Sequence, residues 1–177
     1  GTVDIDSTGF TAYVSGGSVE QVENKFSTLN HLNNKTVSVA GDGGYAGSYM
    51  VSSSTITIDD YYNKVHAGLP YISKLKPMRL EYKQSQNLRG KTIRITELTV
   101  GLHETLGCEF GPDFDNLIPF LFRDVSDPLE APPPLYTGDK RDYFDGDYST
   151  DATICLQQDL PLPLTVLAIV PEFEIRE

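Results

Sequence analysis

The most suggestive chemistry in the sequence is a run of oxygen-bearing side chains at alternate positions. Asp145–Asp151 carries three Asp and one Ser, each separated from the next by one residue. This spacing resembles the first half of a calcium-binding loop. A complete loop of the EF-hand type needs Gly at its sixth position and an acid at its twelfth, but Thr150 and Leu156 stand there. The run is therefore either a looser cation site or a solvated turn between two strands.

The three histidines do not form a metal-binding pattern. His31, His66 and His103 lie far apart in the sequence, and none has a second His or a Cys at the short spacings of zinc sites. The alternation around His66 is typical of a strand. We therefore predict no metal-ligating residue.

Carboxylate pairs are equally unspecific. Asp124 with Asp127, or Glu104 with Glu109, could serve as acid and base, but chance pairs are expected among 25 acids. A glycosidase pair is defined by separation in space, which the sequence does not contain. The chain also has no nucleophile elbow, phosphate-binding loop or dinucleotide fingerprint. We therefore predict no catalytic residue, no cofactor and no enzyme activity.

Cysteine and tyrosine each allow two interpretations. Cys108 and Cys155 are the only cysteines; they could form one disulfide or fill the core, and a stapled secreted scaffold would carry more. The ten Tyr residues could form a platform that stacks on sugar rings, or they could fill β surfaces and the rim of a core.

The composition describes an acidic β protein. The chain of 177 residues has 14 Lys and Arg against 25 Asp and Glu, a net charge of −11. This balance argues against a nucleic-acid-binding protein, because phosphate neutralisation requires basic side chains. Short β-rich segments alternate with Gly, Asn, Asp and Ser clusters, and no stretch has the apolar length of a membrane span. We expect an all-β fold, an antiparallel β-sandwich or barrel with a small inserted β-meander lobe.

The expected organisation has three segments. Residues 1–27 form a leading segment of undefined role, of which residues 3–26 could add strands to the main lobe. Residues 28–62 form the small β-meander lobe, and residues 63–177 form the main sandwich or barrel lobe. The start GTVDIDSTGF lacks an initiator Met and a signal-peptide pattern, so we expect the chain to be a piece of a longer protein.

Three local patterns predict details of the main lobe. The apolar parity changes between Ile93–Ile95 and Leu98–Leu102, which predicts a β-bulge at Thr96–Glu97. Residues 126–152 are rich in Pro and Asp and predict a long surface connection. Leu164–Val170 does not alternate, which predicts a central strand covered on both faces, with Val166, Leu167 and Ile169 buried and flanking prolines that end the pairing.

Longer runs carry a family resemblance. Five of them occur in this order: HLNNKTVSVAGDGG (31–44), STITIDDYYNKVHAGLPY (54–71), ITELTVGLHETLGCEFG (95–111), DPLEAPPPLYTGD (127–139) and QQDLPLPLTVLAIVPEFE (157–174). Together they resemble the C-terminal part of tail nozzle proteins of short-tailed bacteriophages and prophages, also called tail tubular protein B or DNA-stabilisation tail-hub proteins. The resemblance covers residues 28–174, and none of its blocks is a catalytic motif.

The resemblance implies a non-enzymatic structural module of the virion tail. Family members form a ring, usually of six copies, that extends the channel for DNA passage. The implied partners are other tail proteins and copies of the full-length protein, with no sequence-specific nucleic acid and no membrane insertion; we expect the isolated fragment to be a monomer. Assembly would take place in the reducing host cytoplasm, so a disulfide between Cys108 and Cys155 is not expected. The alternative from a different class is a carbohydrate-binding β-sandwich of a tail tip that recognises a host glycan.

Overall fold

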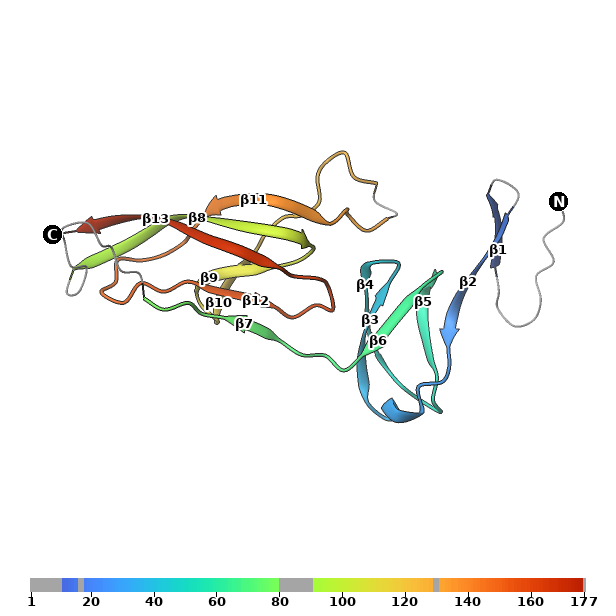
Figure 1. Cartoon of the computed structure of the whole chain (residues 1–177). Helices are drawn as coiled ribbons and strands as arrows, with labels where there is room; N and C mark the ends of the chain where they lie inside the picture. Colours follow the sequence, from blue (N-terminus) through green and yellow to red (C-terminus); the bar gives the residue numbers. More distant parts are fainter. Residues whose placement is uncertain (1–10, 16–17, 80–90, 129–130, 177) are drawn as a thin grey trace. The chain divides into compact units, whose positions relative to one another are not determined.

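The computed structural model describes residues 11–15, 18–79, 91–128 and 131–176 (Figure 1). These residues form thirteen β-strands and one short 3-10 helix, η1 (Asn30–Leu32). All strand pairs between the named strands of this part are antiparallel. The expected all-β antiparallel fold is therefore confirmed. The chain divides into two compact units. The first runs through Tyr71 and also includes Pro132, and the second comprises Ile72–Pro128 and the chain from Pro133.

The first unit has two three-stranded arrays around one core. One array has the order β1 (Thr11–Ser15), β2 (Ser18–Phe26), β5 (Ile56–Tyr62), and the other has the order β4 (Gly44–Met50), β3 (Thr36–Gly41), β6 (Val65–Gly68). Val37 and Val39 of β3 share a buried cluster with Ile56 and Ile58 of β5. Burial of five of the six residues of β3 requires cover on both of its faces.

The strand pairing of this unit differs from a simple meander over residues 28–62. β3 and β4 do form a hairpin, but β5 pairs with β2 and not with β4. β6, which begins at Val65, pairs with the other edge of β3. The unit therefore recruits strands from both sides of that range, because a three-stranded meander is too small to bury its own apolar face.

The second unit contains two sheets that share one core (Figure 1). One has the order β11 (Tyr136–Tyr143), β8 (Thr92–Thr105), β13 (Val166–Arg176); the other has the order β10 (Asn116–Pro119), β9 (Glu109–Asp113), β12 (Cys155–Gln158), β7 (Ser73–Leu75). Leu98 and Val100 of β8 pack in one cluster with Phe110 of β9 and Leu156 of β12. Two sheets with a common apolar interior are the arrangement of a β-sandwich.

The bulge predicted in β8 is confirmed. Glu97 lies opposite Glu172 of β13, whereas Ile95 lies opposite Phe173, so that Thr96 has no partner in the register. The inserted residue resets the parity of the strand. Ile95 and Leu98 are consequently both buried, although they lie three positions apart.

The prediction of a central, fully covered final strand is wrong. β13 lies at an edge of its sheet, and β8 is the central strand. Val166 and Ile169 pack against the core, but Leu167 and Val170 are 67% and 55% exposed. The apolar run lacks alternation because β13 bulges at Leu167 and carries apolar residues on its outward face.

Two further expectations about this unit are corrected. Pairing does not end at Pro171, which lies opposite Leu98 inside β13; proline is tolerated at a sheet edge, where its missing N–H can face away from the neighbouring strand. Residues 126–152 are not only a surface connection, because they contain β11, which pairs with β8. Most β11 residues are exposed, so its sequence lacks the apolar alternation that marks a half-buried strand.

Candidate functional site

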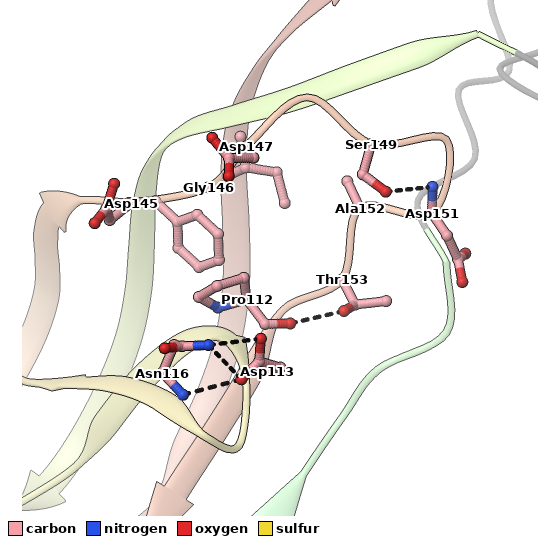
Figure 2. Close-up of a pocket in the computed structure, with 12 residues that line it drawn as sticks. Pro112, Asp113, Asn116, Asp145, Gly146, Asp147, Ser149, Asp151, Ala152 and Thr153 are labelled. Atoms are coloured by element: carbon pink, nitrogen blue, oxygen red, sulfur yellow. Dashed lines mark hydrogen bonds between the residues drawn. The ribbon is translucent and has the colours of Figure 1, made fainter.

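A pocket of about 520 Å³ in the second unit contains the predicted acidic run (Figure 2). One wall is the tip of the β9–β10 hairpin, with Pro112, Asp113 and Asn116. The other wall is the segment between Phe144 and Thr153 that connects β11 toward β12. The pocket is therefore formed by two turns that are far apart in the sequence.

The segment after β11 is an excursion from the edge of β8. Phe144 donates its backbone N–H to the carbonyl of Thr96, and Ser149 pairs with Ile93. The four residues between these anchors leave the sheet, and Arg94 fixes their position by donating from Nε to the carbonyl oxygen of Gly146 at 3.0 Å. A Cβ at position 146 would lie 3.1 Å from the Phe144 ring, so glycine allows the close approach here.

The hairpin wall is organised by Asp113. Its Oδ1 accepts the backbone N–H groups of Asp115 and Asn116, each at 2.9 Å, and its carboxylate accepts the Asn116 side-chain amide at 3.0 Å. The hydrogen bonds from Asn116 and Asp115, together with the charge of Lys76, hold the pKa of Asp113 below its ordinary value. The carboxylate is thus engaged in closing the turn.

The carboxylates of the acidic run do not surround a common point. Figure 2 shows Asp145, Asp147 and Asp151 spread along the course of the segment. Ser149 Oγ is occupied as the acceptor of the Asp151 backbone N–H at 3.0 Å. Across the described parts of the chain, no three His, Cys, Asp or Glu side chains are placed to hold a metal ion. The geometry is that of a turn between two strand segments, the second interpretation of this run.

The histidines are distributed over separate elements. His31 lies in η1 and His66 in β6, both in the first unit, and His103 lies in β8. All three are exposed. Within the described ranges, none of them belongs to a group of three or more His, Cys, Asp or Glu side chains that could hold a metal ion.

The two acidic pairs have local roles. Asp124 donates its backbone N–H to Asp127 Oδ2 at 2.7 Å, which stabilises a turn. Glu109 accepts a hydrogen bond from the side-chain amide of Gln157 on the neighbouring strand at 3.4 Å. Glu104 is exposed and adopts a left-handed backbone conformation with φ of 44°.

The cysteines are core residues. Cys108 and Cys155 are free and buried. Burial raises the pKa of Cys108 to about 12, and burial also raises the pKa of Cys155. Because the thiolate is the nucleophilic form, neither sulfur is prepared for covalent chemistry at neutral pH.

The sequence patterns did not indicate a network on the outer face of the β11–β8–β13 sheet. We call it the Arg–Tyr face; it consists of Arg94, Glu97, Arg141, Tyr143, Tyr148, Glu172, Glu174 and Arg176. Arg141 bridges Glu97 of β8 and Glu172 of β13, and these two carboxylates raise its pKa. The outward alternation of β8 was visible in the sequence, but the cross-strand partners lie more than forty residues away.

The part of the chain that the structure describes thus defines a two-unit antiparallel β protein with a polar pocket and a charge-rich sheet face. No protein-family model matches the chain, and no curated protein shows significant similarity to it. Within the described ranges, no helix is long and apolar enough to span a membrane.

Proposed function

We propose that the chain is a non-enzymatic structural module of a phage tail nozzle that helps to form the distal channel through which DNA passes. The observation that supports this most strongly concerns three of the five sequence runs that resemble the nozzle family. These runs meet side by side at one row of the β11–β8–β13 sheet, where Gly101 lies opposite Asp139 on one side and Ala168 on the other. The three runs that carry the resemblance are therefore in contact with one another in the folded chain.

The close packing at this row explains why the residues of the three runs would depend on one another. A Cβ at position 101 would lie 3.2 Å from Asp139 Oδ1 and 3.5 Å from the Ala168 Cβ. A side chain at position 101 would press on Asp139 Oδ1 and touch Ala168, so the residues at this row of the three runs are expected to vary together.

The charge of the chain supports a role beside moving DNA. A net charge of −11 repels phosphate, whereas every Lys or Arg contact to DNA would add a salt-dependent attraction. A channel component of this kind allows DNA to slide without adhesion. Its partners would be copies of the full-length protein in a ring and other tail proteins, located in the virion after assembly in the host cytoplasm.

Localisation in particles tests this proposal. Antibodies raised against the 177-residue chain would be applied to phage particles from a culture that expresses the full-length parent, and gold label would be located by electron microscopy. We expect label at the distal end of a short tail. Label confined to the capsid, or soluble antigen that never sediments with particles, would contradict the proposal.

The second candidate function, glycan binding, is favoured by one specific observation. Tyr143 and Tyr148 are 55% and 41% exposed on the Arg–Tyr face, beside arginine and glutamate side chains that can contact hydroxyl groups.

A further inference from the structure

The Arg–Tyr face is ordered by contacts among its own side chains. Arg94 Nη2 donates to the hydroxyl of Tyr143 at 3.0 Å. The guanidinium of Arg94 and that of Arg176 lie 5.9 and 5.8 Å from the centre of the Tyr148 ring, within the range of cation–π attraction. The Tyr148 hydroxyl donates to Glu174 Oε2 at 3.2 Å. The side chains are thus held in position before any ligand arrives, which lowers the entropy cost of binding.

The backbone explains why these residues share one surface. Tyr143, Glu97 and Glu172 form one row across the three strands, and Arg94 lies opposite Glu174 two rows further along. Tyr148 enters from the excursion that Arg94 anchors through Gly146. The face is therefore part of a continuous sheet, and sheet positions hold side chains more rigidly than loops do.

The charges of this face balance, unlike those of the whole chain. The chain has 14 basic and 25 acidic side chains, but the face combines three arginines with three glutamates: Arg94, Arg141, Arg176, Glu97, Glu172 and Glu174. Arginine only donates hydrogen bonds and ionised glutamate only accepts them. The face consequently contains both donors and acceptors, with little net charge to select a cation or an anion.

A sugar hydroxyl fits this combination of donors and acceptors, because it donates and accepts at once. Tyr143 and Tyr148 are 55% and 41% exposed as whole residues. The two guanidinium groups lie over the Tyr148 ring, so Tyr143 is the residue that offers apolar ring area to the C–H side of a sugar. An acidic glycan would be repelled by the overall charge of the chain, −11.

We propose that the Arg–Tyr face binds a neutral oligosaccharide chain, with Tyr143 as the main stacking residue and the Arg and Glu side chains as hydroxyl partners. The face extends over three strands, which suits an extended segment of several sugar units. This activity does not depend on the nozzle role, because a chain could fail to bind glycan and still be part of a tail, and the reverse also holds.

The test is an NMR titration of the whole 177-residue chain with three neutral probes, maltohexaose, cellohexaose and chitohexaose, and one acidic probe, hexagalacturonate. Concentrations up to about 10 mM would saturate a site with a Kd near 1 mM. We expect at least one neutral probe to shift backbone signals of Tyr143, Tyr148 and Glu174, and hexagalacturonate to bind more weakly.

Three variants identify the face. Tyr143→Ala should weaken binding by roughly tenfold, whereas Tyr143→Phe should keep most of the affinity, because the ring remains and only the bond to Arg94 is lost. The matched control is Tyr61→Ala in the first unit, which removes a tyrosine of similar exposure, 45%, and should leave binding unchanged. Far-UV circular dichroism verifies that all three variants are folded.

Four outcomes of the titration would overturn the proposal. No neutral probe shifts any signal, or the shifts map to residues outside the Arg–Tyr face. Tyr143→Ala and Tyr61→Ala lose equal affinity, or hexagalacturonate alone binds. The last would instead assign the face to acidic polymers.

Discussion

Two leucine-to-alanine changes in one sheet test whether β8, and not β13, is the central strand. Leu98 of β8 has 0% exposure and packs in the core with Phe110 and Phe144. Leu98→Ala should therefore cost about 2–5 kcal/mol, the range for emptying a packed aliphatic site. Leu167 of β13 is 67% exposed. Because only a third of its surface is buried, Leu167→Ala should cost about 0.5–1 kcal/mol, a third of the value for a fully buried side chain.

The assay is urea unfolding followed by far-UV circular dichroism, since the chain has no Trp to report by fluorescence. With a urea slope of about 1–3 kcal/mol/M, Leu98→Ala should lower the midpoint of the second unit by about 1–2 M. Leu167→Ala should change it by a few tenths of that amount. Equal midpoints for the two variants would refute the reasoning, because they would require β13 to be covered on both faces.

Three other predictions follow from the same structure. Deletion of Thr96 should abolish cooperative unfolding of the second unit in a thermal melt, because without the bulge the two halves of β8 would direct their apolar residues to opposite faces; retained cooperativity would mean that the bulge is dispensable. The pKa of Asp113 is lower in the folded state, so its contribution to stability is present above the ordinary Asp pKa of about 3.9 and is lost as pH falls through the folded value. Asp113→Asn should thus lower Tm at neutral pH and have little effect at pH well below that value; an equal loss at both pH values would contradict this. A reducing agent should leave Tm unchanged, and the thiols of Cys108 and Cys155 should react with a thiol reagent only on unfolding; fast reaction of the native chain would contradict their burial.

The sequence predicted features that are encoded within one strand. The bulge at Thr96 was predictable because both halves of β8 bury one face. The apolar positions therefore change parity between Ile95 and Leu98, and this change is visible within a few neighbouring residues. For Cys108 and Cys155 the sequence left a disulfide and a core role open, and the structure shows both as free, buried residues. The prediction of the bulge needed only a local pattern.

Features that depend on pairing between distant segments were not predictable. Leu167 and Val170 gave β13 the composition of a covered strand, but an edge strand can also carry apolar residues outward. β11 was missed because five of its eight residues are exposed, so it lacks an apolar alternation, and because its strand conformation depends on pairing with β8. The Arg–Tyr face combines Arg94 with Tyr143 and Tyr148 across the sheet, so no short window of sequence contains it.

The edge position of β13 has a consequence for how the chain behaves when it is concentrated. A long outer strand of eleven residues exposes a row of unpaired backbone groups, which is the template on which fibrils grow. In β13 the bulge at Leu167 interrupts this row, Pro171 removes one donor, and Glu172 and Glu174 place charge beside it. A copy arriving in register would meet a bent, charged and incomplete edge. The bulge, the proline and the two carboxylates therefore each oppose edge-to-edge pairing of two copies through β13, which is the first step of cross-β growth.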